Sequence, residues 1–415
     1  MESILFKNAA LLDPARSELL EGHDVLVEDG LVKEVSDRPL STARARVIDL
    51  KGKTLMPGLI DLHVHVIAVQ LNLPQQMAMP NVLVTFRSAP ILRDMLRRGF
   101  TTVRDAGGAG HAFKQAVEQG LVQGPRLFVS GRALSQTGGH GDGRARTDFI
   151  PGDSPCPCCV RVGALARVAD GVDEVRRAVR QELQMGADQI KIMASGGVAS
   201  PTDPVGAWGY SEDEIRAIVA EARARQTYVL AHAYTADAIA RAVRCGVRTI
   251  EHGNLVDAEA ARLMADSGAY VVPTLVTYEA LATEGADLGL PADSVAKIAQ
   301  VRNAGLRSLE IYRDAGVSMG FGTDLLGPSH RLQSDEFRLR AEVLGPQAVI
   351  ASATLVGAEV LGMQDKLGRI APGAFADMLV VDGNPLRDLS CLLGQGEHIP
   401  LVMQGGKVQF DELAV

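Results

Sequence analysis

Four histidines, one lysine and one aspartate in this chain of 415 residues could together form a metal centre. Each of them lies in, or closely follows, a short apolar run, and they are His63, His65, Lys191, His232, His252 and Asp324. Imidazole and carboxylate ligands suit Zn²⁺ and similar first-row ions, and a catalytic site leaves coordination positions open. Taken singly, each histidine could be an ordinary polar residue at a strand end. The ordered set of four favours a metal site.

His63 and His65 are separated by one residue, Val64. If this segment is a strand, the side-chain period of two places both imidazoles on the same face, about 7 Å apart along the backbone. Two neutral ring nitrogens can then bind one ion.

Lys191 lies within Gln189–Met193, a run typical of a buried strand, and lysine is almost never buried without a partner. Burial lowers a lysine pKa, and a neutral amine beside metal ions can react with carbon dioxide. The resulting carbamate would be a carboxylate able to bridge two metals. The alternative is a lysine whose side chain extends past the end of the strand to solvent.

Asp324 ends the segment Gly320-Phe321-Gly322-Thr323-Asp324, where the glycines allow the backbone to approach a site closely. A carboxylate there could bind metal and also act in turn as general base and general acid. The alternative is a turn aspartate that caps the next helix.

Eight apolar runs of strand type alternate with segments of helical pattern, as expected of a parallel sheet. In one helical segment, Ser211 is followed three residues later by Glu214, which predicts a capping box. Eight such units predict a (β/α)₈ TIM barrel over residues 58–361, with the active site at the carboxyl ends of its strands. The runs are Leu59–His63, Thr101–Asp105, Arg126–Ser130, Gln189–Met193, Tyr228–His232, Thr249–His252, Tyr270–Thr274 and Ser318–Thr323.

Both ends of the chain contain short alternating runs separated by turn residues, a pattern typical of antiparallel strands. We expect residues 1–57 and 362–415 to pair into one small, discontinuous β-sandwich domain.

Composition excludes several classes of partner. Hydrophobic residues make up 47% of the chain, the net charge is −8, and the basic residues form no block. This predicts a protein that binds neither nucleic acid nor membranes, and a small molecule is the expected partner.

The cysteines and the amino terminus predict a cytoplasmic protein. Three of the five cysteines, Cys156, Cys158 and Cys159, crowd together in a pattern that is not a disulfide framework. The first residues do not have the pattern of a secretory signal. The cysteine cluster could bind an extra zinc ion, but no second pair has finger spacing, so a lid segment is favoured.

The segment Pro57-Gly58-Leu59-Ile60-Asp61-Leu62-His63-Val64-His65, with Lys191, His232, His252 and Gly322-Thr323-Asp324, resembles the amidohydrolase superfamily over essentially the whole chain. The resemblance implies that His63, His65 and Asp324 hold the more buried of two divalent metals, expected to be Zn²⁺. It implies that His232 and His252 hold the more exposed metal, and that carboxylated Lys191 bridges the two.

Two further motifs resemble the imidazolonepropionase-related branch, which holds Xaa-Pro and other dipeptidases and ochratoxin-hydrolysing amidohydrolases. They are Thr137-Gly138-Gly139-His140-Gly141-Asp142 and His232-Ala233-Tyr234. The resemblance implies that His140 and Tyr234 contact substrate. The alternative is a flexible glycine loop at 138–143 and a Tyr234 that serves only packing.

We therefore predict a zinc-dependent, binuclear amidohydrolase that cleaves the amide bond of a dipeptide or N-acyl amino acid by attack of a metal-bridging hydroxide, with Asp324 moving the proton. The resemblance also implies a homo-oligomer. Two alternatives stay open, namely hydrolysis or deamination of a cyclic amide or imidazolone, and a non-catalytic scaffold. Loss of a ligand would favour the scaffold, and none is missing.

Overall fold

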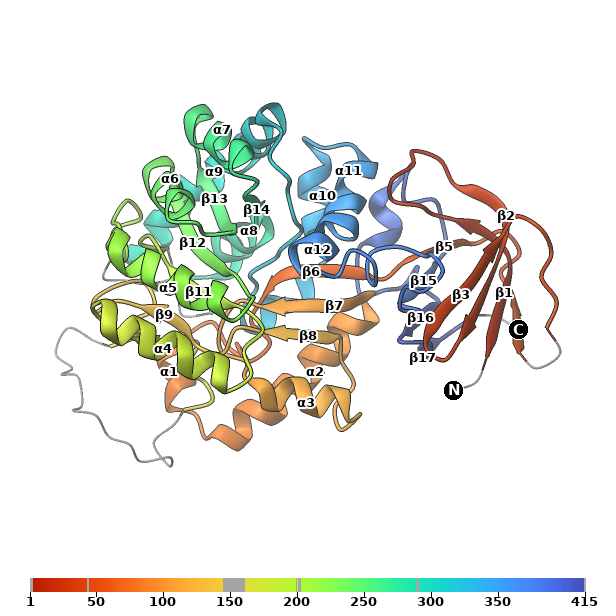
Figure 1. Ribbon diagram of the computed structural model, residues 1–415, viewed down its shortest axis with the longest axis horizontal. Coiled ribbons are helices and arrows are strands. Elements are labelled where there is room, and N and C mark those ends of the chain that lie inside the picture. Colours follow the sequence, from red (N-terminus) through yellow and green to blue (C-terminus); the bar gives the residue numbers. More distant parts are fainter. Residues whose placement is uncertain are drawn as a thin grey trace.

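The computed structural model describes residues 3–42, 45–144, 161–198, 200, 203–288, 290 and 292–413. The cysteine cluster at 156–159 lies outside these residues. Within them, two parallel sheets carry the candidate site, and a third sheet joins the two ends of the chain (Figure 1).

The parallel sheets have six and three strands. Their orders are β10-β9-β11-β12-β13-β14 and β6-β7-β8. The bounds are β6 Leu59–Val64, β7 Phe100–Asp105, β8 Arg126–Val129, β9 Ala133–Ser135, β10 Ala166–Val168, β11 Ile190–Met193, β12 Val229–Thr235, β13 Thr249–Leu255 and β14 Tyr270–Val272. Seven of the eight predicted runs coincide with one of these strands, whereas β9 and β10 were not predicted.

The eighth run, Ser318–Thr323, is not a strand, so this prediction was wrong. Met319 forms only an isolated bridge with Val271. The segment is confined between β14 and β6, because a Cβ atom on Gly320 would lie 2.4 Å from the Leu62 side chain. Its backbone bonds go to both neighbours: the Val271 N–H donates to the Ser318 carbonyl, and the Leu62 N–H donates to that of Phe321.

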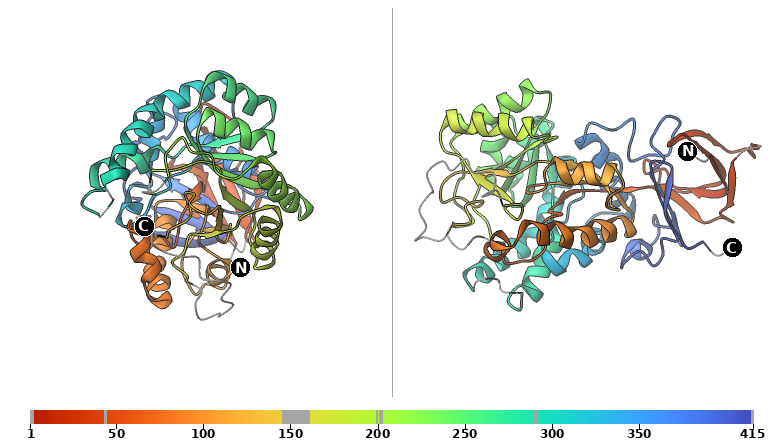
Figure 2. Two further views of the ribbon diagram at one scale, coloured as in Figure 1. Left: turned by 90° about the vertical axis from the view of Figure 1, so that its left-hand side faces the viewer. Right: turned by 90° about the horizontal axis from the view of Figure 1, so that it is seen from below.

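Helices surround the parallel strands, as the end-on view in Figure 2 shows. The capping box predicted for Ser211 and Glu214 is confirmed at the start of α5. Among the described residues, no helix is both long and apolar enough to cross a bilayer. The helices are α1 Leu73–Ala78, α2 Asn81–Arg97, α3 His111–Glu118, α4 Val172–Gln184, α5 Glu212–Ala224, α6 Ala236–Arg244, α7 Ala258–Asp266, α8 Leu275–Glu284, α9 Ala292–Ala315, α10 Asp335–Ala341, α11 Pro346–Ser352 and α12 Leu355–Val360, with 3₁₀ turns at Gly327–Leu332 and Leu389–Leu392.

The third sheet confirms that the two ends of the chain pair. Its strands are β1 Ile4–Leu11, β2 Leu20–Glu28, β3 Leu31–Ser36, β4 Arg46–Asp49, β5 Thr54–Pro57, β15 Met378–Val381, β16 Leu401–Gln404 and β17 Lys407–Asp411. β15 runs antiparallel to β5, with Met378 opposite Pro57. Its buried side chains, such as Phe6 and Val25, form a cluster of their own. The sheet lies at the right of Figure 1, beyond the helices.

Candidate metal centre and active site

The six predicted ligands come together at the carboxyl ends of the parallel strands. Each histidine or lysine lies on a strand or just after one, as for His63 on β6, Lys191 on β11, His232 on β12 and His252 on β13. These side chains are buried, as is His65 directly after β6. Asp324 is the most open of the six, with 22% of its side chain exposed.

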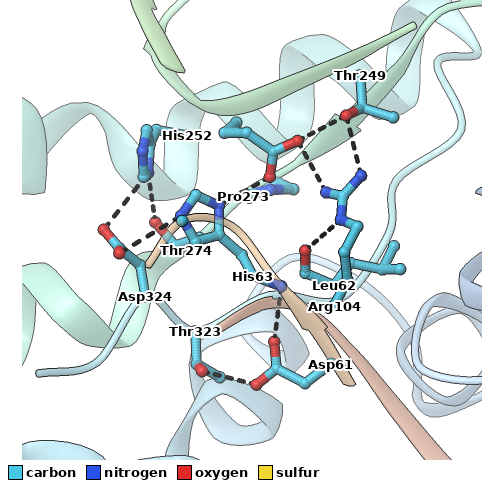
Figure 3. Close-up of polar contacts among 12 residues, drawn as sticks. Asp61, Leu62, His63, Arg104, Thr249, His252, Pro273, Thr274, Thr323 and Asp324 are labelled. Atoms are coloured by element: carbon cyan, nitrogen blue, oxygen red, sulfur yellow. Dashed lines mark hydrogen bonds and ion pairs between the residues drawn. The ribbon is translucent and has the colours of Figure 1, made fainter. Parts of the chain in front are cut away.

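Asp324 is the centre of the cluster. Its Oδ1 atom lies 3.1 Å from His65 Nε2 and 3.4 Å from His63 Nε2, and its Oδ2 atom lies 3.9 Å from His252 Nδ1. One ligand atom from each of His63, His65 and Asp324 falls within a mutual distance of 4.8 Å, close enough to share a cation. Figure 3 shows the Asp324 carboxylate facing both His63 and His252.

Asp61 fixes the backbone beneath this cluster. Its Oδ1 atom accepts from the His63 N–H at 3.0 Å, and its Oδ2 atom accepts from the Thr323 hydroxyl at 2.6 Å. The Asp324 N–H in turn donates to the His63 carbonyl at 2.8 Å. These bonds place β6 and the glycine-rich segment in register with each other (Figure 3).

Each of the four imidazoles has one ring nitrogen at hydrogen-bond distance from a protein oxygen. Where the ring donates in this bond, the tautomer is fixed and the other ring nitrogen keeps a free lone pair, as metal-binding histidines require. The bonds are His63 Nδ1 to Glu251 Oε2 at 2.7 Å, His65 Nδ1 to the Gly107 carbonyl at 2.8 Å, His232 Nε2 to the Gly196 carbonyl at 3.0 Å, and His252 Nδ1 to Thr274 Oγ1 at 2.8 Å.

Burial and charge favour the cation-binding protonation states of His232, His252 and Asp324. At His65 burial lowers the pKa, but the hydrogen bond and charge of Asp324 outweigh burial and raise it. Burial lowers the pKa of His232 and of His252 well below the usual value, which keeps both rings neutral. Burial would raise the pKa of Asp324, but the charges and hydrogen bonds of His63 and His65 lower it well below its usual value. The donor set of neutral imidazoles with an ionised carboxylate fits divalent metals.

Lys191 is 2% exposed and lies among charged groups. Burial lowers its pKa to about 8, although the negative charges of Glu251 and Asp324 oppose that shift. About a tenth of this amine is therefore unprotonated at pH 7, far more than for an ordinary lysine, and this is the form that can react with carbon dioxide.

Glu251 is a buried residue of the site that the sequence analysis missed. Its carboxylate accepts from His63, from Arg104 at 2.8 Å and from the Thr249 hydroxyl at 2.6 Å. Burial alone would raise the pKa of Glu251, but Arg104 and His63 overcome this effect and lower it to about 2. An ionised Glu251 thus orients His63, and Arg104 balances its charge.

Strand alternation explains why Glu251 was missed. Consecutive strand residues normally point to opposite faces, so His252 as a ligand implied that Glu251 pointed away from the site. The backbone at His252 instead has φ +73°, a left-handed conformation uncommon outside glycine, and Asp324 has φ +52°. Such strain of about 1–3 kcal/mol each is typical of functional sites.

His140 and Tyr234 lie against the histidines. The His140 ring stacks on that of His232 with centroids 4.4 Å apart, and the Tyr234 ring lies 4.8 Å from His232 and 5.3 Å from His252. The structure therefore brings all eight predicted site residues together.

His140 also contacts groups that no sequence pattern marked as part of the site. Its Nδ1 atom lies 3.6 Å from Asp203 Oδ2, an atom that also accepts from the Gly197 N–H at 2.8 Å. A Cβ atom on Gly197 would come within 2.0 Å of the His140 ring, so glycine is needed there. No local pattern marked Asp203, because it faces His140 only through the folding of its loop.

The chain is similar to several known proteins. The model described as "Amidohydrolase family" matches residues 54–408. A solved amidohydrolase structure is 74% identical with a TM-score of 0.98, covering 99% of this chain and 100% of its own. A solved prolidase in complex with N-methylphosphonate-L-proline is 59% identical with a TM-score of 0.96 and the same coverage. Ochratoxinase from Aspergillus niger is 31% identical over 412 residues, which are 96% of this chain and 85% of the ochratoxinase.

Proposed function

Because the chain belongs to the amidohydrolase family, we propose that it is a binuclear metal hydrolase that cleaves the amide bond of dipeptides or N-acyl amino acids. The observation that carries the proposal is the set of four imidazoles, each with one ring nitrogen bonded to the protein, arranged around Asp324 and Lys191. A scaffold that had lost its metals would not need all six residues in this arrangement.

The proposed metal sites follow the donor set. His63, His65 and Asp324 would hold one divalent ion and His232 and His252 the second, with a carbamate on Lys191 between them. Zn²⁺ suits these ligands. When bound, such ions supply the Lewis acidity that polarises an amide carbonyl and lowers the pKa of water.

Asp324 is the proposed proton carrier. Its carboxylate is ionised at neutral pH, so that it can accept a proton from the attacking water. The same proton is then delivered to the leaving nitrogen as the C–N bond breaks. Asp324 suits this role because it is the most exposed of the six residues.

His140 and Tyr234 are the proposed contacts for the carboxylate of the leaving amino acid. The similar prolidase was solved with a compound that carries a methylphosphonate on the nitrogen of L-proline. The α-carboxylate of proline lies two bonds from that nitrogen, and an imidazole and a phenol can both donate hydrogen bonds to it.

We also propose that the two parallel sheets belong to one closed (β/α)₈ barrel, residues 58–361. The support is the pair of backbone bonds by which the segment around Gly320 joins β14 and β6. The sheet from the chain ends would be a separate β-sandwich domain, residues 1–57 and 362–415.

The direct test compares N-acetyl-L-proline with its C-terminal carboxamide on the metal-loaded enzyme. Charge-assisted hydrogen bonds contribute roughly 1.5–3 kcal/mol each, so the acid should be cleaved with a kcat/KM about ten- to a hundredfold higher or more. His140→Ala and Tyr234→Phe should reduce this preference. The matched control is Tyr270→Phe. Tyr270 is the first residue of β14, at the opposite end from the site, and its ring packs against Arg248. Equal turnover of acid and amide by the wild type would contradict the proposal and favour a cyclic substrate.

A further inference from the structure

Tyr278 on α8 is a buried phenol that contacts the candidate substrate residue Tyr234. Its hydroxyl donates to that of Tyr234 at 3.0 Å, and the two rings meet edge to face with centroids 6.1 Å apart. Both side chains belong to the same apolar cluster, where Tyr278 is 1% exposed and Tyr234 is 2% exposed. A hydroxyl buried this deeply is costly unless it is hydrogen-bonded.

The chain of hydrogen bonds continues from Tyr278 to the metal centre. Thr274, just before α8, is hydrogen-bonded to Tyr278 and also to His252 Nδ1. The Tyr278 hydroxyl has a single proton, which it donates to Tyr234. Tyr278 must therefore accept the hydrogen bond that it shares with Thr274.

The direction of this chain is set at His252. The single hydroxyl proton of Thr274 goes to Tyr278, so in this arrangement Thr274 must accept a proton from His252 Nδ1. If His252 Nδ1 donates to Thr274, the Nε2 lone pair is free for a cation. In the reverse direction, His252 Nδ1 would accept a proton from Thr274, and Nε2 would carry a hydrogen and could not bind metal. The tautomer of His252 that binds metal and the arrangement described above are thus the same state.

In that state, Tyr234 already accepts the proton of Tyr278, and its own proton is the last one in the chain. We infer that Tyr278 is a positioning residue that fixes the Tyr234 hydroxyl as a hydrogen-bond donor to the carboxylate of the substrate. The inference rests on the proposed function, because it assumes that a carboxylate meets Tyr234. Recognition of this carboxylate would then be linked, through Tyr278 and Thr274, to His252, a proposed ligand of the second metal ion.

The test is a double-mutant cycle of Tyr278→Phe and Tyr234→Phe, with Tyr270→Phe as the matched tyrosine control. Tyr278→Phe keeps the ring in its cluster and removes only the hydroxyl. It should lower kcat/KM for N-acetyl-L-proline about tenfold, mainly through KM, and change that for the carboxamide little. In the Tyr234→Phe background, the same change should have almost no further effect.

Binding provides a readout besides activity. The affinity for N-methylphosphonate-L-proline, measured by calorimetry on the metal-loaded proteins, should fall by a similar factor in Tyr278→Phe and follow the same non-additive pattern. Equal losses in both backgrounds, or equal losses for acid and amide, would show a merely structural role and overturn the inference. A wild type that does not prefer the acid would instead contradict the proposed function.

Thr274 provides a second route if Tyr278→Phe does not fold. Thr274→Ser keeps the hydroxyl and should retain the preference for acid over amide, whereas Thr274→Val should reduce it. The ratio of the two substrates cancels any general change in metal content. Indistinguishable ratios in the two variants would overturn the inference.

Discussion

The two halves of the candidate metal centre are held by different chemistry. On the His63 side, the orienting group is the ionised carboxylate of Glu251, paired with a fully buried Arg104. On the His232 and His252 side, the orienting groups are a carbonyl and a hydroxyl, both neutral. A charged acceptor raises the basicity of its histidine more than a neutral one does. The His63 half is therefore expected to bind its metal ion more tightly than the other half.

Asp324 serves both halves, so its replacement should have the largest effect. Asp324→Asn should preserve the fold and lower kcat for N-acetyl-L-proline by about 10²–10⁴-fold, because it removes the proposed proton carrier. Steady-state kinetics and a thermal melt would measure the two properties. A near-normal kcat would assign the proton transfer to another group.

Acid should weaken the charged half through Glu251. Its folded-state pKa of about 2 lies below the usual 4.5, so Glu251 stabilises the protein above about pH 4.5 and loses that effect as the pH falls toward 2. The shift corresponds to roughly 3 kcal/mol. Urea unfolding of metal-depleted wild type and Glu251→Gln between pH 5 and 3 isolates this contribution, because Gln does not titrate. The wild type should lose more stability than the variant, and parallel curves would contradict the assignment.

Glu251→Gln should also weaken metal binding by about 10–100-fold, the usual effect of removing an orienting group beyond the ligands. The affinity should fall for only one of the two ions. Chelator competition on the folded variant measures it, and an unchanged affinity for both ions would contradict the role of Glu251.

Thr274→Val should have the smallest effect on metal affinity, below about tenfold, because it removes a neutral acceptor from His252. The comparison with Glu251→Gln under identical chelator conditions directly tests the difference between the halves. If Thr274→Val lost metal more readily than Glu251→Gln, the proposed difference in metal affinity between the two halves would be contradicted.

Much of the fold and the ligand set could be predicted from local sequence. Strand alternation predicted that His63 and His65 share one face. The pairing of the chain ends was predicted from the short alternating apolar runs that both ends contain. Seven strands were recognised because each is a short apolar run bounded by turns. The prediction of a strand at 318–323 failed because Gly320 and Gly322 pass between two strands without forming a regular ladder of hydrogen bonds. Only the tertiary structure imposes this constraint.

The groups that orient the ligands were harder to find. Glu251 was hidden by the left-handed backbone of His252, and Thr274, Tyr278 and Asp203 reach the site only through contacts distant in sequence. The identity of the metal, the carbamate, the oligomeric state and the cytoplasmic location stay predictions.

The central claim, a binuclear centre bridged through Lys191, is tested most directly by elemental analysis of the purified wild type and Lys191→Ala, each paired with its rate of N-acetyl-L-proline hydrolysis. We expect two divalent ions per chain in the fully active wild type, and a lower metal content with loss of activity in the variant. A fully active wild type with one ion per chain, or a Lys191→Ala protein with wild-type metal and rate, would contradict the claim.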